Sequence, residues 1–396
     1  MQTFSFDMYQ TLAIAAVALL LGSFLNNKIP VLKRFCIPSP VTGGMVFAAV
    51  TCILYSAGIV EIVFTDTLRE VCMVFFFTSV GFYANLKVLK AGGKALIFLV
   101  LLVTGMIVLQ NVVAVSLSTV VGLDPLVGMC TGSVPMTGGH GISGAFGPIL
   151  EDLGVNGALT ICTAAATFGL IGGSLMGGPL GNSLIRKKDL VKTAVMDDIS
   201  GSDPEGKEEK RVLIHYAPAA LQLILAVGIG TGISYLLSLT GMSFPIYMGA
   251  LIAAVVIRNV GDVTGKIKIY TGEIEEIGGI MLGLFLGMAM ISLKIWQLAD
   301  LALPFLLLLA AQVVLMFVYA RFVVFNVMGH DYDAAVISAG VCGFGMGATP
   351  NAMANMQAIC DKYVPSVKAF LLIPIVGSLF NDLINSFVIT FFINSV

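Results

Sequence analysis

The sequence predicts an all-α polytopic membrane protein with two inverted-topology repeats of five transmembrane helices, each repeat holding a glycine-rich re-entrant or broken segment. Composition is the first observation behind this prediction. The 396 residues are 58% hydrophobic and 11% charged, with a mean hydropathy of +0.98, against about 45–50% and 25% in soluble domains. The second observation is a series of long apolar segments on both sides of one polar stretch. The third is a pair of glycine-dense stretches, one in each half of the chain.

The apolar segments are long enough to cross a membrane, since roughly 20 residues span about 30 Å of hydrocarbon. Residues 1–185 form the predicted N-terminal repeat, with spans expected at 8–25, 41–61, 70–86, 95–121 and 156–182. Residues 186–211 mix both charges with Gly, Ser and Pro, and we expect a flexible linker there. Residues 212–396 form the C-terminal repeat, with spans expected at 215–238, 245–258, 276–292, 302–326 and 368–393.

The placement of basic residues predicts the orientation of these spans. With the N-terminus outside, all of the 21 Lys and Arg residues except Arg69 and Lys294 fall on inside loops or the linker. Because inside loops carry an excess of basic residues, we expect both termini outside and the linker in the cytoplasm. An odd number of spans in each half gives the halves opposite topology. The segment 125–149 then dips in from outside and the segment 334–357 from inside.

Weak sequence echoes support the repeat. Asp124 precedes the first glycine-dense segment as Asp333 precedes the second, and Gly173-Ser174-Leu175 in one half matches Gly377-Ser378-Leu379 in the other. The echoes occur in the same order and at a nearly constant offset, which favours an internal duplication over coincidence.

Glycine and proline interrupt the apolar pattern most densely within residues 128–146 and 338–356. Gly costs a helix interior about 1 kcal/mol and Pro about 3 kcal/mol relative to Ala, so both stretches are poor helices. In lipid, unwound backbone persists only where protein or a watery cavity surrounds it. Half-helix N-termini suit a carboxylate, and bare carbonyls suit Na⁺, so the pair predicts a transporter's binding site. Close helix packing is the alternative for such glycines, and we favour it for the stretch from Gly172 to Gly181.

Enzyme motifs are weak in this sequence. Gly343-Phe-Gly-Met-Gly-Ala348 matches a dinucleotide-binding pattern, but no strand precedes it. Gly141-Ile-Ser-Gly144 resembles the serine motif of intramembrane proteases, yet no histidine is placed to act as its base. The seven cysteines are expected to be small buried hydrophobes, and no basic patch of the kind that binds nucleic acid is present. We therefore expect no enzyme, no organic cofactor and no nucleic-acid partner.

Several motifs together resemble one known family. They are Leu123-Asp-Pro125, Thr137-Gly-Gly-His-Gly141, Tyr332-Asp-Ala-Ala335, Cys342-Gly-Phe-Gly-Met-Gly-Ala-Thr-Pro350 and Ala354-Asn-Met-Gln-Ala358. This pattern is similar to that of the bacterial sodium/glutamate symporters and runs over nearly the whole chain. The resemblance implies Na⁺-coupled uptake of L-glutamate across the bacterial inner membrane. Both termini, which the basic residues place outside, would then be periplasmic. It also implies a homodimer in the lipid bilayer and an elevator-type motion.

Candidate binding residues follow from the interrupted segments and the one acid expected well inside a span. For the substrate they are Thr137, Gly138, Gly139, His140, Gly141, Ser143, Gly345, Gly347, Thr349, Asn351 and Asp382. Backbone amides would hold the carboxylates, and neutral hydroxyl and amide groups would add contacts. His140 has two open roles, substrate contact or structural hydrogen bonding. Asp382 would receive the substrate ammonium or a cation, or pair as part of the structure. Candidate surroundings for the coupling Na⁺ are Gly138, Cys342, Gly343, Asp382 and Asn385.

Two other functions remain open at this point. A cation-coupled symporter of another small carboxylate, such as a dicarboxylate or a 2-oxo acid, would need the same anion-binding helix ends. A passive channel could also contain broken helices, but it has no need of an inverted repeat with paired tips.

Overall fold

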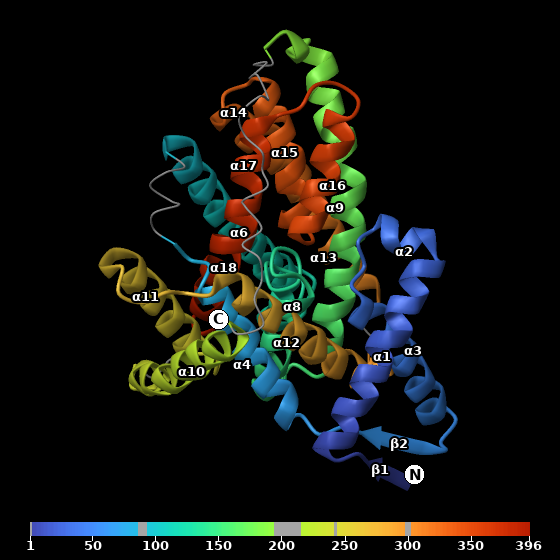
Figure 1. The fold of residues 1–396 in the computed structure, drawn as a ribbon. Helices are drawn as coiled ribbons and strands as arrows, with labels where there is room; N and C mark the ends of the chain where they lie inside the picture. Colours follow the sequence, from blue (N-terminus) through green and yellow to red (C-terminus); the bar gives the residue numbers. More distant parts are fainter. Residues whose placement is uncertain (1, 86–92, 194–214, 241–243, 298–301) are drawn as a thin grey trace.

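The computed structural model describes residues 2–85, 93–193, 215–240, 244–297 and 302–396, and this part of the chain is almost entirely helical (Figure 1). The predicted linker from residue 194 onward, the first residues of the predicted C-terminal repeat and the last residue of the predicted span 70–86 lie outside the described residues. One strand pair joins the helices: β1 (Gln2–Ser5) runs parallel to β2 (Val60–Val63), with Gln2 opposite Val60. The sequence did not predict this small sheet.

Helices account for the rest of the described architecture. In the first half they are α1 (Met8–Lys28), α2 (Pro30–Arg34), α3 (Ser39–Ser56), α4 (Thr67–Gly81), α6 (Gly93–Val120), α7 (Pro125–Met129), α8 (Gly139–Asp152), α9 (Ala158–Lys188) and the short η1 (Leu190–Thr193). In the second half they are α10 (Tyr216–Ser238), α11 (Met248–Thr264), α12 (Thr271–Ile291), α13 (Ala302–Val318), η4 (Tyr319–Val324), α14 (Phe325–Val327), α15 (Tyr332–Gly345), α16 (Thr349–Cys360), α17 (Val367–Ile375), η5 (Val376–Phe380) and α18 (Asn381–Ile393).

Every predicted span overlaps a helix, but not all of these helices are long. Within the described residues, seven are long and apolar enough to cross a membrane, and the pair α17 and α18, bent by 44°, would make an eighth. The predicted spans 70–86 and 245–258 correspond to α4 and α11, which have 15 and 17 residues. The multi-pass, all-helical class is therefore confirmed, while the count of ten full-length spans is not. The inverted repeat and its domain boundaries stay predictions.

Both expected interruptions are present. In the first, α7 ends at Met129, the chain turns through residues 130–138, and α8 begins at Gly139. In the second, α15 ends at Gly345 and α16 begins at Thr349. Gly139 has φ +57°, a left-handed conformation that favours glycine at the first break. The chain thus carries two helix–break–helix segments, each ahead of a long apolar stretch.

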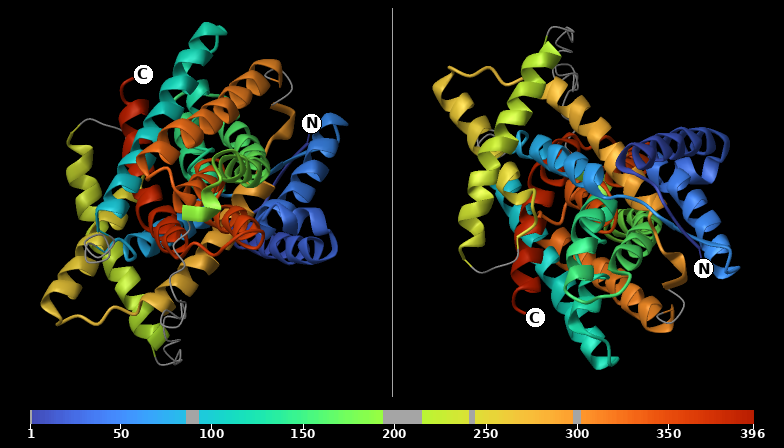
Figure 2. Two further views of the ribbon diagram at one scale, coloured as in Figure 1. Left: turned by 90° about the horizontal axis from the view of Figure 1, so that it is seen from above. Right: turned by 90° about the horizontal axis from the view of Figure 1, so that it is seen from below.

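The helices form two packing groups. The first helix group, made of α1, α3, α4, α10, α11 and α12, lies low in Figure 1, with α1 and α3 on one side and α10 and α11 on the other in Figure 2. The second helix group consists of α6 to α9 and α13 to α18. Helices pack mainly within their group, and α8 against α12 is the most extensive contact between the groups. Aromatic side chains also pack at this boundary. The rings of Phe77 and Tyr247 stack with 3.9 Å between their centroids, and Phe146 contacts the same tyrosine edge-on.

Glycines of α9 let the second interrupted segment approach closely. A Cβ on Gly173 would lie 2.8 Å from the Cys342 carbonyl oxygen, and one on Gly177 would lie 2.7 Å from the carbonyl oxygen of Ala339. Gly178, by contrast, has nothing within 4 Å of such a Cβ. The packing interpretation of this glycine stretch therefore holds for Gly173 and Gly177. These contacts fix α15 and α16 against α9, and so fix the place of the second break.

Candidate functional site

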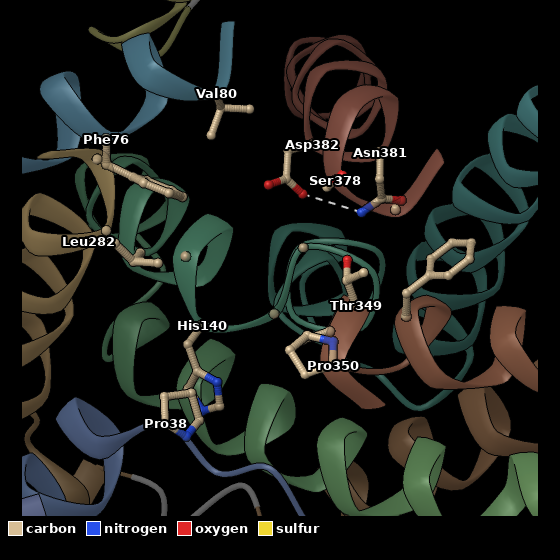
Figure 3. Close-up of a pocket in the computed structure, with 18 of the residues that line it drawn as sticks. Pro38, Phe76, Val80, His140, Leu282, Thr349, Pro350, Ser378, Asn381 and Asp382 are labelled. Atoms are coloured by element: carbon tan, nitrogen blue, oxygen red, sulfur yellow. Dashed lines mark hydrogen bonds between the residues drawn. The ribbon is translucent and has the colours of Figure 1, made fainter. Parts of the chain in front are cut away.

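A cavity of about 490 Å³ lies between the two helix groups, where both interrupted segments meet. Figure 3 shows Phe76 and Val80 of α4 and Leu282 of α12 on one wall, facing Ser378, Asn381 and Asp382 of η5 and α18. His140 and Thr349 come from the two breaks and lie between these walls. The cavity size falls in the range of about 300–1,000 Å³ that is usual for small-molecule sites.

Two helices begin at this cavity. The lining includes residues 138–141 at the start of α8 and residues 347–350 at the start of α16. The starts of α8 and α16 are in contact, because a Cβ on Gly139 would lie 3.0 Å from the Gly347 carbonyl oxygen. The first N–H groups of a helix have no intrahelical acceptor and carry a partial positive charge. The cavity therefore has two helix N-termini suited to an anion.

Gln110, in the middle of α6, ties the two breaks together. Its Nε2 donates to the Gly345 carbonyl oxygen at 2.7 Å, and its Oε1 accepts from the Thr137 hydroxyl at 2.6 Å. Its own carbonyl accepts from Nε2 of Gln312 at 2.9 Å. Gln110 and Gln312 are fully buried, so these hydrogen bonds form away from solvent. One side chain thereby sets the position of the first break relative to the second.

Side-chain amides from α18 hold the first break from the other side. Nδ2 of Asn381 donates to the Thr137 carbonyl oxygen at 3.2 Å, and Nδ2 of Asn385 donates to the Ser133 carbonyl oxygen at 3.0 Å. Unwound carbonyls in a membrane need such partners, because each unpaired group costs several kcal/mol. The bend between α17 and α18 thus lies beside the turn that it supports.

His140 is held by a neighbouring helix. Its Nε2 lies 3.0 Å from the Thr167 hydroxyl oxygen, and that hydroxyl donates to the Thr163 carbonyl oxygen at 3.0 Å. A hydroxyl has only one hydrogen to donate, so Nε2 must carry the proton and donate to Thr167. His140 thus makes a structural hydrogen bond and also lines the cavity, and its contact with a substrate stays a prediction.

Two carboxyl groups line the cavity, and no lysine or arginine appears among its described lining residues. Asp382 accepts from Nδ2 of Asn381 at 3.3 Å. Glu275 of α12 lies at the junction with a second cavity of about 260 Å³, and Tyr83 lines both cavities with it. The site combines positive helix ends with negative side chains, as a zwitterion or an anion–cation pair would require.

Eight of the predicted substrate residues line the cavity: Thr137, Gly138, Gly139, His140, Gly141, Gly347, Thr349 and Asp382. Ser143, Gly345 and Asn351 do not. The Ser143 hydroxyl donates to the Cys162 carbonyl oxygen at 3.4 Å, and Asn351 donates to the Leu170 carbonyl oxygen at 3.0 Å. A Cβ on Gly345 would lie 2.7 Å from Sδ of Met106. These three residues pack the tips onto α9 and α6 and do not face the cavity.

The predicted surroundings of the Na⁺ divide in the same way. Gly138 and Asp382 line the cavity, whereas Cys342, Gly343 and Asn385 are buried behind it. A Cβ on Gly343 would lie 2.4 Å from the Ala352 backbone, so this glycine allows α15 to pack on α16. Cys342 lies on the face of α15 that meets α9. Asn385 supports the first break, as described above.

The sequence reasoning missed Glu275, Asn381 and Gln110. Glu275 was placed in a loop because the predicted span began at 276, whereas α12 begins at Thr271. Gln110 and Asn111 form a polar pair in the middle of the most apolar span. That pair was the signal that could have identified Gln110. Polar residues at membrane depth cost free energy and mark functional or structural contacts.

Comparison with known proteins identifies a family and several named relatives. A family model described as Sodium/glutamate symporter matches residues 4–365. Proteins named Sodium/glutamate symporter from Escherichia coli (strain K12) and Shigella flexneri are 36% identical over 395 residues, covering 98% of this chain and 98% of each relative. One from Haemophilus influenzae is 36% identical over 389 residues, covering 97% and 96%. A solved sodium proton antiporter from Methanocaldococcus jannaschii aligns over 97% of this chain and 94% of its own, with 16% identity and a TM-score of 0.42.

The fold and the site define a multi-pass membrane transporter, with two interrupted helix segments that meet at a cavity between helix groups. Its relatives are named as symporters, which are transporters and not enzymes. The chain belongs to the sodium/glutamate symporter family.

The role of Gln110 in joining the two breaks can be tested by measuring thermal stability. Gln110→Met keeps the length of the side chain but removes the amide, and it leaves the Gly345 carbonyl to the Thr137 hydroxyl at 3.3 Å. The change thus replaces two short buried hydrogen bonds by one longer one, and a hydrogen bond contributes about 0.5–1.5 kcal/mol, so we expect a lower thermal unfolding midpoint in detergent. Leu109→Met is the matched control, because Leu109 is the preceding residue and its side chain is exposed. Equal midpoints for the two variants would contradict this role.

Proposed function

We propose that this chain is a sodium-coupled secondary active transporter that imports L-glutamate across the bacterial inner membrane. The observation that carries the proposal is the meeting of two helix N-termini and two carboxyl groups in one cavity. The family to which the chain belongs supports sodium and glutamate as the solutes.

The polarity of the site suits glutamate. Its two carboxylates would lie at the N-termini of α8 and α16, near Gly138, Gly139 and Gly347, with the Thr349 hydroxyl as a further donor. Its ammonium would lie at Asp382, on the wall of the cavity formed by η5 and α18. A substrate with carboxylates and an ammonium uses both kinds of polar group that the lining offers.

Charge supports the need for sodium. Glutamate is a net monoanion, and moving one negative charge inward against an inside-negative potential costs about 2.3 kcal/mol per 100 mV. One co-transported Na⁺ cancels this term, and further Na⁺ ions would draw on the potential as well. Sodium coupling therefore supplies both the missing charge and the driving force.

The boundary between the helix groups supports an elevator-type motion as part of the proposal. Both interrupted segments and Asp382 belong to the second helix group, whereas α4 and α12 supply the facing wall. A substrate held by the second group would move with it past the first group. The homodimer and the periplasmic termini stay predictions from the sequence. The mass of the detergent-solubilised protein and the labelling of terminal tags in cells would test them.

Uptake into proteoliposomes tests the function directly. With an inward Na⁺ gradient we expect labelled L-glutamate to accumulate above its outside concentration, and replacement of Na⁺ by K⁺ should abolish accumulation. Equilibration without accumulation would indicate a channel. Sodium-driven uptake of a dicarboxylate or a 2-oxo acid in place of glutamate would move the substrate assignment to that class.

The role of Asp382 is tested by Asp382→Asn, which keeps the shape and removes the charge. Charged hydrogen bonds contribute about 1.5–3 kcal/mol, so we expect the KM for L-glutamate to rise by about tenfold or more. Asp189→Asn is the control, because Asp189 is an exposed residue paired with Lys192. If Asp382→Asn keeps the wild-type KM and the wild-type Na⁺ requirement, Asp382 binds neither the ammonium nor the ion.

The elevator part is tested by cross-linking the two groups. A Cβ on Gly157, which precedes α9 and has φ +72°, would lie 3.1 Å from Cβ of Gln297, six residues beyond the end of α12. The Gly157→Cys single variant is therefore the control for backbone strain, and it should keep uptake. The pair Gly157→Cys and Gln297→Cys should form a disulfide that stops uptake, and a reductant should restore uptake. The control pair Ala15→Cys and Gly287→Cys joins α1 to α12 inside the first group, with 3.4 Å between the corresponding Cβ atoms, and should leave uptake intact. Normal uptake with the first pair fully cross-linked would rule the motion out.

A further inference from the structure

Unpaired polar atoms gather behind the first break. Among the described residues, Oδ1 of Asn381, Oδ1 of Asn385 and Oγ of Ser133 are buried side-chain oxygens without a hydrogen-bond partner. The side chains of Ser133 and Asn385 are fully buried, and that of Asn381 is 3% exposed. Buried polar atoms are nearly always paired, so three unpaired oxygens around one turn need an explanation.

The hydrogen bonds of the two asparagines place both side chains beside the first break. Nδ2 of Asn385 donates to the Ser133 carbonyl oxygen, and Nδ2 of Asn381 donates to the Thr137 carbonyl oxygen and to Asp382. In each asparagine, Nδ2 donates a hydrogen bond and Oδ1 accepts none. The two asparagines are four residues apart on α18 and share one face of that helix. Both side chains therefore contact the turn from Ser133 to Thr137.

Asn111 of α6 completes the surroundings in another role. Its Oδ1 accepts from the Ser133 N–H at 2.8 Å, and its unpaired atom is Nδ2, a donor. A donor does not ligate a cation, so Asn111 positions the Ser133 peptide. A Cβ on Gly132 would lie 2.6 Å from this Oδ1, so only glycine lets Asn111 approach so closely.

We propose that Oδ1 of Asn385, Oδ1 of Asn381 and Oγ of Ser133 bind a sodium ion behind the first break, outside the solute cavity. The proposal rests on the sodium coupling proposed above and gives it a location. Neutral oxygens suit a hard monovalent cation, and unwound backbone near the membrane midplane is where transporters bind Na⁺. The Asp382 carboxylate, next to Asn381, supplies compensating negative charge.

The location also connects the ion to the solute. Ser133 and Asn385 do not line the cavity, whereas Thr137 and Asn381 do. An ion held between α18 and the turn would fix the backbone from Ser133 to Thr137. That backbone leads directly to the N-terminus of α8, where the solute carboxylate would bind.

Ser133→Ala is a clean test, because the hydroxyl that it removes makes no hydrogen bond in the structure. If the Ser133 hydroxyl had only a structural role, its removal would not change the dependence on Na⁺. We expect the NaCl concentration for half-maximal thermal stabilisation, measured without glutamate at constant ionic strength in KCl, to rise by about tenfold or more. The Na⁺ concentration for half-maximal uptake should rise in parallel, with little change in the glutamate KM at saturating Na⁺. Asn385→Ala should shift both Na⁺ values in the same direction.

Ser118→Ala is the matched control, because Ser118 is also fully buried but its hydroxyl donates to the Val115 carbonyl oxygen at 2.8 Å. It should keep the wild-type Na⁺ dependence. If Ser133→Ala also keeps it while the wild type is driven by Na⁺, the inferred site is wrong and sodium coupling stands. If the wild type itself transports glutamate without Na⁺, both the site and the coupling are overturned.

Discussion

The structure depends on pairing the backbone of two unwound turns that lie inside a helical membrane protein. Carbonyl groups freed by a break cannot turn to water, so other parts of the protein must donate to them. Here the donors are side-chain amides: Gln110 for the second break, and Asn381 and Asn385 for the first. Because these amides belong to α6 and α18, the breaks are held by helices. The cavity keeps its shape for the same reason.

Glycine allows close packing throughout the two breaks. Gly138 and Gly347 line the cavity, yet a Cβ on them would lie 2.6 Å from the Val134 carbonyl oxygen and 2.9 Å from the Gly343 carbonyl oxygen. Gly343 and Gly345 face helices, where missing side chains let α15 pack on α16 and α6. Close packing at these glycines lets the two breaks meet at the cavity. It explains the density of glycine in each segment.

Sequence reasoning could find the breaks but not assign every residue in them. Proline and glycine clusters at Gly138 and Pro350 are incompatible with a continuous helix, so the two interruptions were predictable. Which glycines face a cavity depends on contacts with α9 and α6, and no local pattern contains that information. Asp382 was found because a lone acid in a span stands out. Glu275 was missed because hydropathy placed the start of α12 too late. The ends of α4 and α11 were also misplaced, since α4 ends at Gly81 and α11 continues to Thr264.

The first break offers a physical route for coupling the ion to the solute. The turn from Ser133 to Thr137 would contact the ion on the face toward α18, and its end enters the cavity. An ion that orders this turn removes part of the entropy that the solute would otherwise have to overcome on binding. By linkage, the solute must then raise the affinity for the ion by the same factor, with coupling free energies typically about 1–3 kcal/mol. Mutual strengthening of this kind disfavours a half-loaded transporter, and a symporter needs that property to avoid dissipating its sodium gradient.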